Sequence, residues 1–267
     1  MSVFQFNRAI VREPGRSVAD GLRFEDRGAP SYAAVQAEHH AYAEALRSAG
    51  VDVTTLPPLE AFPDSLFVED PALVFSEGAI LLRPGAPTRI GEVGELAPAI
   101  RGYFGLVIEL PHGFADGGDV LVTPDLVMIG LSERTDRTGA EQLAACLDQL
   151  GHKSRIVETP DDVLHLKSAC SLLDHETMLC TPSLAETGML AKFRCIITAD
   201  GEDDSANALR VNDVLFVDTT GLKTNDQLNR LGYQLAPLET SEISKIDAGL
   251  SCMSLRWLSV SDSSGRA

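Results

Sequence analysis

The chain has 267 residues, of which 44% are hydrophobic and 6% aromatic, so it can bury a core of the size expected for one large domain. Its 39 acidic against 22 basic residues give a formal net charge of −17, which argues against a nucleic-acid partner. The acidity is weakly favourable for a cationic substrate, although it would also serve solubility alone. There is no basic leader with an apolar core and no apolar run of about 20 residues, so we expect a cytoplasmic protein without a membrane partner.

In chain order, the first predicted unit has a strand within residues 3–11, a helix over 32–48 and a strand over 51–56. It lacks an inner strand, which residues 252–258 at the other end of the chain could supply. In its helix, His39 and His40 are expected to face solvent. The second unit begins near Phe67, with strands over 73–75 and 80–82, a helix after Gly91 and a strand over 106–110.

The third unit predicts a hairpin of strands 119–123 and 126–129, a helix over 139–150 opened by a capping box of Thr138 and Glu141, and a strand over 154–158. The fourth has strands over 178–180 and 195–197 on either side of a helix near 184–193. The fifth has a strand over 214–217, a helix capped by Thr224 and Gln227, and a strand over 233–235.

Polar residues recur at the same point of successive units. Asp70, Asp119, His165, Asn207 and Cys252 follow one another at intervals of 49, 46, 42 and 45 residues, which is typical of an internal repeat. Five such units would close a ring. We therefore predict an α/β fold, a five-bladed pseudo-symmetric propeller of ββαβ-type repeats around a central active site. Residues 1–258 would form a single catalytic domain and 259–267 a polar tail.

The five cysteines are an odd number without a C-x-x-C pair, which predicts neither a disulfide framework nor a zinc ribbon. Four of them lie in apolar runs, where a small buried thiol is ordinary: Cys146, Cys170, Cys180 and Cys195. Cys252 differs, because small and polar residues surround it shortly after Gly249. A thiol in such a position can act as a nucleophile.

Equivalent positions of a ring of repeats point toward its axis, so the recurring polar residues would meet there. Together they supply a nucleophile, a general acid/base and anchors for a cation. Each also has an ordinary alternative: His165 between two leucines could be a core histidine, and residues 116–119, Asp-Gly-Gly-Asp, could form a turn. Their recurrence at one phase favours a site. The chain lacks H-E-x-x-H, G-x-x-x-x-G-K-[ST] and G-x-G-x-x-G, so we expect no metal and no organic cofactor.

Five motifs in order closely resemble those of dimethylarginine dimethylaminohydrolase, over a region from about Arg8 to Trp257. They are FPDSLFVED at 62–70, RPGA at 83–86, DGGD at 116–119, LHLK at 164–167 and GLSC at 249–252. The resemblance implies the five-bladed α/β propeller of guanidine-modifying enzymes. It also implies hydrolysis of asymmetric dimethylarginine or monomethylarginine to citrulline and dimethylamine or methylamine, through a covalent thiouronium on cysteine.

Carried over residue by residue, the resemblance implies a catalytic triad of Cys252 as nucleophile, His165 as proton donor and later base, and Asp116 as the acid that orients the histidine. It implies substrate-binding roles for three guanidinium-binding acids, two carboxylate anchors and two backbone contacts: Asp64, Glu69, Asp70; Arg89, Arg134; Leu22, Ile246. Residues 16–22 resemble a flexible lid. Two positions depart from the family pattern, since Asp116 is glutamate in some bacterial relatives and Ala208 replaces a cysteine seen in several members.

Three other readings stay open. Arginine deiminases and other guanidine hydrolases need the same central groups, but deiminases usually carry an extra helical insertion for which this chain has no room. Amidinotransferases replace water by an amine and also tend to be longer. A non-catalytic guanidine-binding protein would be expected to lose part of the triad, which is present here. We expect the substrate to be a small methylated arginine. The sequence leaves the oligomeric state open, and a homodimer is one of the options.

Overall fold

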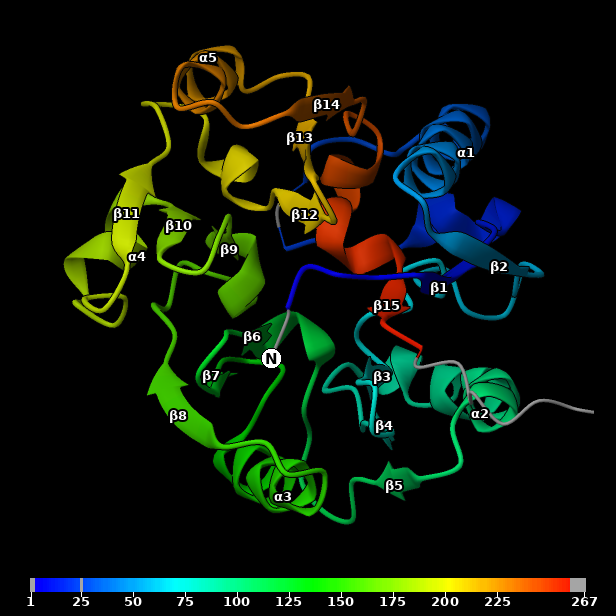
Figure 1. Cartoon of the computed structure of the whole chain (residues 1–267). Coiled ribbons are helices and arrows are strands. Elements are labelled where there is room, and N and C mark those ends of the chain that lie inside the picture. Colours follow the sequence, from blue (N-terminus) through cyan, green and yellow to red (C-terminus); the bar gives the residue numbers. More distant parts are fainter. Residues whose placement is uncertain (1–2, 25, 260–267) are drawn as a thin grey trace, which may run out of the picture.

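The fold is a ring of five three-stranded sheets. This computed structural model describes residues 3–24 and 26–259. In each sheet the middle strand pairs antiparallel with an inner strand and parallel with an outer one. Figure 1 shows the inner strands around the centre and the helices on the outside. The predicted α/β propeller of repeats is therefore confirmed.

The first sheet joins the two ends of the described chain, as the sequence predicts. Its inner, middle and outer strands are β15 (Leu255–Trp257), β1 (Arg8–Arg12) and β2 (Asp52–Leu56). Arg8 of β1 lies opposite Trp257 of β15, in antiparallel register. Closure of the ring thus depends on pairing between residues almost the whole chain apart.

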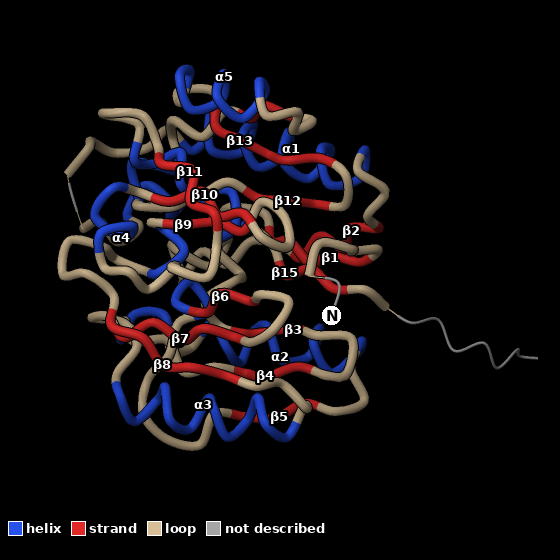
Figure 2. The backbone as a smooth tube through the Cα atoms, turned by 60° about the vertical axis from the view of Figure 1, so that its left-hand side comes forward, coloured by secondary structure: helices blue, strands red, loops and turns tan. Residues whose placement is uncertain are grey.

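The other four sheets follow in chain order. They consist of β3 (Ala72–Val74), β4 (Ala79–Leu81) and β5 (Val107–Glu109); β6 (Val120–Val122), β7 (Val127–Leu131) and β8 (Ser154–Glu158); β9 (Cys170–Leu172), β10 (Thr177–Cys180) and β11 (Arg194–Ile197); and β12 (Leu209–Val211), β13 (Val214–Asp218) and β14 (Leu235–Leu238). The tube view in Figure 2 shows the strands of these sheets running side by side, with helices covering the outer strands.

One helix per unit connects the middle strand to the parallel outer strand, because a parallel pair needs a crossover. The helices are α1 (Tyr32–Ser48), α2 (Glu92–Tyr103), α3 (Arg137–Gln149), α4 (Pro182–Glu186) and α5 (Leu222–Arg230). α4 is shorter than predicted, since it ends at Glu186 and turns fill the chain as far as β11. None of the helices in the described ranges is both long and apolar enough to cross a bilayer.

Two predicted helix starts are wrong. In α3 the capping side chain is Asp136, whose Oδ1 accepts from Gly139 N at 2.6 Å, so Thr138 already lies inside the helix. In α5 the buried Thr224 hydroxyl accepts from Ala199 N instead. The first amides of α5 donate to Glu202, which comes from the preceding loop, with a Thr224 N to Oε2 distance of 2.8 Å. A cap supplied from outside the helix leaves no local sequence pattern.

α1 shows how the buried face of a helix follows its period. Its inward residues include Val35, His39, Tyr42 and Leu46, which recur every three or four positions. His39 is therefore buried, contrary to the expectation that it faces solvent, whereas the next residue, His40, is exposed.

The expected polar tail falls mostly outside the described residues, which end at Ser259. Ser259 itself is held to the first blade, because its backbone N donates to Asn7 Oδ1 at 2.7 Å and its carbonyl accepts from Asn7 Nδ2 at 3.0 Å. Ser259, predicted as part of the tail, is thus bound to the first blade.

Candidate active site

A pocket at the ring's axis is lined by every predicted site residue except Glu69. The reason lies in the repeat: a short turn precedes the inner strand of each blade, and these turns converge. Asp116 immediately precedes the turn before β6, His165 the turn before β9, and Cys252 lies in the turn before β15. Asp70 occupies the corresponding place two residues before β3.

Cys252 lies in the single 3₁₀ turn Leu250–Met253 and is partly buried. Its backbone N donates to Gly249 O at 3.2 Å, and Gly249 N lies 3.5 Å from its Sγ. Asn207 of the neighbouring blade supports this turn, since its Oδ1 accepts from Ser251 N at 3.0 Å. A side chain at Gly249 would overlap the Asn207 amide, which explains the glycine. Asn207, one of the polar residues that recur along the chain, thus helps to hold the turn that carries the thiol.

The surroundings of Cys252 disfavour a resting thiolate. Burial, together with the nearby carboxylates of Glu69 and Asp70, raises the pKa of the Cys252 thiol to about 12. A cation bound beside the sulfur would oppose both effects. The thiol is therefore expected to ionise mainly when a cationic group occupies the pocket.

His165 is paired with Asp116, with 3.1 Å between Nε2 and Oδ2. The other oxygen of Asp116 accepts from Gly85 N at 2.7 Å, and Asp116 N donates to Thr135 Oγ1 at 3.1 Å. Gly85 thus holds one carboxylate oxygen and Thr135 holds the backbone of Asp116, and the other carboxylate oxygen pairs with the imidazole. Nδ1 of His165 has no hydrogen-bonding partner among the described residues, which leaves it available to a substrate.

The carboxylates around His165 hold its proton. Burial lowers the pKa of His165, but Asp119, Asp116 and Asp70 together outweigh burial and raise the pKa to about 9. Asp119 does not line the pocket; its oxygens accept from Ser132 Oγ at 2.6 Å, Thr135 Oγ1 at 2.7 Å and Leu166 N at 2.9 Å. The histidine is therefore an imidazolium at neutral pH and can donate a proton.

Two more of the predicted acids line the pocket, Asp64 and Asp70. Asp64 Oδ1 accepts from Leu22 N and Asp70 Oδ1 from Gly118 N, both at 3.0 Å. Burial raises the pKa of Asp70, but the charges of Arg89 and His165 outweigh it, so the net shift is downward. Asp70, Asp116 and His165 each offer one ligand atom within 4.8 Å of the others, so this set has the spacing to hold a cation. The same acids can bind an organic cation as well as a metal ion.

The two predicted carboxylate anchors differ in what they already bind. Arg89 lines the pocket, but its guanidinium is buried against Asp70, Glu92 and the carbonyls of Asp64 and Phe67. Most of its donors are thus engaged within the protein. Arg134 also lines the pocket, and its guanidinium has no partner among the described residues.

The structure separates Glu69 from the other predicted acids. Its Oε1 lies 2.5 Å from Lys167 Nζ, its Oε2 accepts from Ser251 Oγ at 3.0 Å, and it lines a different cavity. Glu69 thus does not line the axis pocket, and its role as a guanidinium-binding acid stays a prediction.

The lid-like segment 16–22 contains the 3₁₀ helix Arg16–Asp20. Glu60 accepts from Arg16 N at 2.9 Å and Ser17 N at 3.0 Å, and Val18 is fully buried. Leu22 lines the pocket at the end of this segment.

The sequence interpretation missed four residues that line the pocket: Phe67, Leu164, Asp247 and Ala248. Each lies within five residues of a predicted site residue, so proximity in sequence is the only signal that could have found them. Asp247 adopts a left-handed conformation, with φ of 55°, at the end of the 3₁₀ helix Ile243–Ile246.

A family model described as arginine deiminase matches residues 99–213. The N(G),N(G)-dimethylarginine dimethylaminohydrolase of Pseudomonas aeruginosa is 39% identical over 255 residues, which cover 94% of this chain and 100% of that protein. The chain belongs to the dimethylarginine dimethylaminohydrolase family. The Streptomyces coelicolor member is 31% identical over 253 residues, covering 93% of this chain and 96% of its own length.

Solved structures of this family have the same fold. A variant of the Pseudomonas aeruginosa enzyme with cysteine replaced by serine, in complex with citrulline, matches with a TM-score of 0.92 and 38% identity, covering 95% of this chain and 100% of that one. An adduct of a histidine-to-glycine variant with S-methyl-L-thiocitrulline matches with a TM-score of 0.91 and 38% identity, over 94% of this chain and 99% of that one. The N-terminal domain of the arginine dihydrolase ArgZ, at 18% identity and a TM-score of 0.84, covers 95% of this chain and 99% of its own and shares the fold.

Proposed function

We propose that this protein hydrolyses asymmetric dimethylarginine or monomethylarginine to citrulline and dimethylamine or methylamine. The observation that carries the proposal is one pocket that combines the thiol of Cys252, the His165–Asp116 pair and the carboxylates of Asp64 and Asp70. Membership in the family and the citrulline and thiocitrulline ligands of its solved structures support the same substrate class.

The first chemical step is attack on the guanidinium carbon. That carbon is a poor electrophile because its charge is shared over three nitrogens, so a strong nucleophile must be held next to it. Asp64 and Asp70 bind the planar cation through charge-assisted hydrogen bonds. The bound cation lowers the pKa of the Cys252 thiol by its charge, so the thiol releases its proton to solvent and the thiolate forms a bond from sulfur to carbon.

His165 completes both halves of the reaction. As an imidazolium, held by Asp116, it gives its proton to the departing dimethylamine, and a thiouronium remains on Cys252. The neutral imidazole then takes a proton from water, which attacks the same carbon and releases citrulline with the thiolate as leaving group. The pKa of about 9 keeps His165 protonated at the start of the cycle.

Arg134 is the principal anchor for the substrate's carboxylate in this proposal. Its guanidinium has no other partner among the described residues. Arg89, in contrast, already donates to the carboxylate of Asp70 and to the carbonyls of Asp64 and Phe67. The carboxylate contact distinguishes a free amino acid from its decarboxylated analogue.

Arginine deiminase activity is the second candidate, favoured by the match of its family model to residues 99–213. The two activities differ in the amine released. Incubation with asymmetric dimethylarginine and with arginine, followed by measurement of citrulline, dimethylamine and ammonia, separates them. Citrulline with equimolar dimethylamine supports the proposal. Ammonia from arginine at a higher kcat/KM would instead favour the deiminase, and no citrulline from either substrate would refute both.

A further inference from the structure

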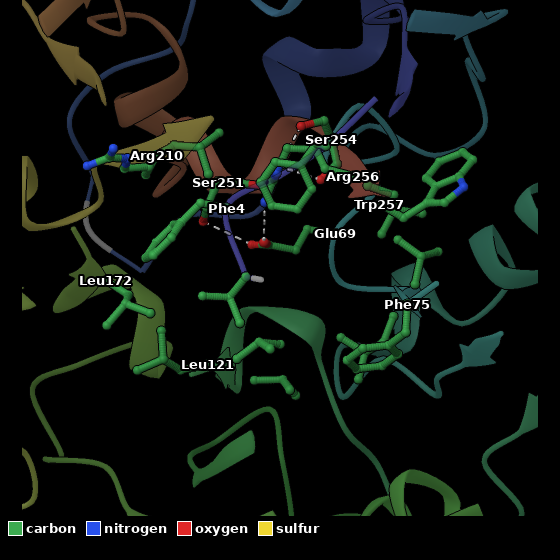
Figure 3. Close-up of a pocket in the computed structure, with 18 of the residues that line it drawn as sticks. Phe4, Glu69, Phe75, Leu121, Leu172, Arg210, Ser251, Ser254, Arg256 and Trp257 are labelled. Carbon is green, nitrogen blue, oxygen red and sulfur yellow. Dashed lines mark hydrogen bonds and ion pairs between the residues drawn. The ribbon is translucent and has the colours of Figure 1, made fainter. Parts of the chain in front are cut away.

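We propose that Arg256 is a positioning residue for the nucleophile. Its guanidinium binds the turn that carries Cys252, on the side of that turn away from the substrate pocket. Its positive charge partly neutralises Glu69, which binds the same turn. The inference rests on the proposed function, in which Cys252 attacks the substrate. Arg256 is in β15 and lines a second cavity, of about 190 Å³, together with Glu69, Ser251 and Ser254 (Figure 3).

One nitrogen of Arg256 bonds to the backbone on both sides of the nucleophile. Nη1 donates to Ser254 O at 2.8 Å and lies 3.2 Å from Ser251 O. Cys252 lies between these two carbonyls in the chain. A single planar guanidinium therefore fixes the turn that aims the sulfur, which an ammonium group could do only in part.

The second nitrogen reaches Glu69, which holds the same turn. Arg256 Nη2 lies 3.6 Å from Glu69 Oε1, and the two side chains are 11% and 5% exposed. Glu69 in turn accepts from Ser251 Oγ at 3.0 Å, and its backbone N donates to Cys252 O at 3.2 Å. The dashed contacts in Figure 3 show these side chains converging above the cavity. Arg256 and Glu69 thus form one support beneath Cys252.

The same contacts connect Arg256 to the ionisation of the thiol. Glu69 raises the pKa of Cys252, and only Lys167 and Arg256 form ion pairs with Glu69 among the described residues. Removal of Arg256 leaves this carboxylate less neutralised, so the thiolate becomes harder to form. The other charged groups that face Cys252 across the pocket remain in place in such a variant: Asp64, Asp70, Arg89, Asp116, Arg134, His165 and Asp247.

Arg210 provides a matched control. It lines the same cavity and its guanidinium lies 5.5 Å from the Phe4 ring, as that of Arg256 lies 5.9 Å from Phe6. Its hydrogen bonds, however, go to the carbonyls of Asn212 and Leu173, away from the nucleophile. Arg210→Met therefore removes a comparable arginine without touching the turn.

The test compares Arg256→Met, Arg256→Lys and Arg210→Met in steady-state kinetics on dimethylarginine. The pH dependence of Cys252 alkylation by iodoacetamide is followed in parallel, through the mass of the Cys252 peptide. We expect Arg256→Met to lower kcat about tenfold or more, with KM within about twofold of wild type. Near neutral pH, far below the pKa of the thiol, the alkylation rate follows the thiolate fraction and should fall by roughly threefold to tenfold. Arg256→Lys should restore this alkylation rate while recovering kcat only in part, and Arg210→Met should change neither quantity.

An Arg256→Met variant with wild-type kcat and an unshifted alkylation profile would overturn the proposal. So would an equal loss of kcat in Arg210→Met, because it would indicate general loosening around the cavity. If Arg256→Met does not fold, Arg256→Lys decides: a lower kcat with an unchanged alkylation rate supports the inference, and a wild-type kcat overturns it. If the wild type does not turn over dimethylarginine at all, the proposed function fails, while the alkylation profiles still test the positioning.

Discussion

At the scale of single residues, the site keeps its nucleophile protonated and its acid charged. The pKa of the Cys252 thiol is raised to about 12, so the nucleophile is protonated at neutral pH. The pKa of His165 is raised to about 9, so its imidazole is charged and can donate a proton. This arrangement makes ionisation of the thiol depend on a bound cation. It also protects the cysteine from reagents when the pocket is empty.

Replacement of the nucleophile should separate binding from chemistry. Cys252→Ser is expected to lower kcat by several powers of ten, because a hydroxyl is a far weaker nucleophile near neutral pH, while dimethylarginine still binds. His165→Gly should also lose turnover, and the mass of the quenched protein would show an adduct on Cys252 if attack outlasts hydrolysis. Cys195→Ser, which lies outside the pocket, is the control. More than about a tenth of wild-type kcat in Cys252→Ser would exclude the assigned role.

The two pocket arginines should respond differently to truncation. Arg134→Ala is expected to lower kcat/KM for dimethylarginine by about tenfold to a hundredfold, since it removes a charge-assisted contact worth roughly 1.5–3 kcal/mol. It should leave the thermal midpoint nearly unchanged. Arg89→Ala should instead lower the thermal midpoint, because it leaves buried Asp70 and Glu92 without their counter-charge.

Agmatine derivatives, which lack the carboxylate, check the same assignment. They should be poor substrates of the wild type and should lose little further activity in Arg134→Ala. Equal turnover of the amino acid and the agmatine derivative would argue for a decarboxylated or protein-bound guanidine as substrate.

At the scale of elements, the repeat explains what could be predicted from the sequence. The α1 and β8 bounds match their hydrophobic patterns residue for residue, because local burial determines both. The caps of α3 and α5 could not be assigned correctly, since Asp136 competes with Thr138 locally and Glu202 arrives from another loop. The placement of Glu69 outside the axis pocket could not be predicted for a similar reason, because a motif gives the order of two acids but not which cavity each side chain lines.

Gly118 tests how the turn before β6 shapes the site. A Cβ at this position would lie 2.8 Å from Cγ of His165 and 3.0 Å from Asp70 Oδ1, so Gly118→Ala must displace the imidazole. We expect kcat to fall at least about tenfold, as proton transfer needs hydrogen-bond geometry. Gly94→Ala is the matched control, because Gly94 is an exposed residue of α2 with open space around its Cβ. It should keep full activity and gain about 0.5–1 kcal/mol of stability. Full activity in Gly118→Ala would mean that the His165 position is not critical.

At the scale of the whole molecule, ring closure brings together groups with opposing pH dependence. His165 has a pKa raised from 6.5 to about 9 in the folded state, so its stabilisation is present below pH 6.5 and lost as the pH rises through 9. Buried His39 has a pKa lowered to about 4, so its neutral form stabilises the fold above pH 6.5 and this contribution is lost as the pH falls toward 4. Together, these two histidines favour maximal stability near pH 6.5.

Substitution of His39 isolates the acid limb of this dependence. Below pH 6.5 the unfolded chain binds a proton at His39 that the folded chain excludes, and Nε2 of His39 has no partner in the described structure. The loss should amount to about 2 kcal/mol between pH 6.5 and 4.5. Glu92, whose pKa is raised to about 7, acts in the opposite direction over this range, so the wild-type slope alone is not diagnostic. The difference between wild type and His39→Gln cancels the contribution of Glu92, because Glu92 is present in both.

Urea unfolding at pH 4.5, 6.5 and 9 measures this difference. The loss of unfolding free energy at acid pH should be smaller in His39→Gln and unchanged in His40→Gln, because His40 is exposed. An equal loss of unfolding free energy at acid pH in all three proteins would mean that protonation of His39 does not destabilise the fold. The assignment of His39 as a buried neutral histidine would then be wrong.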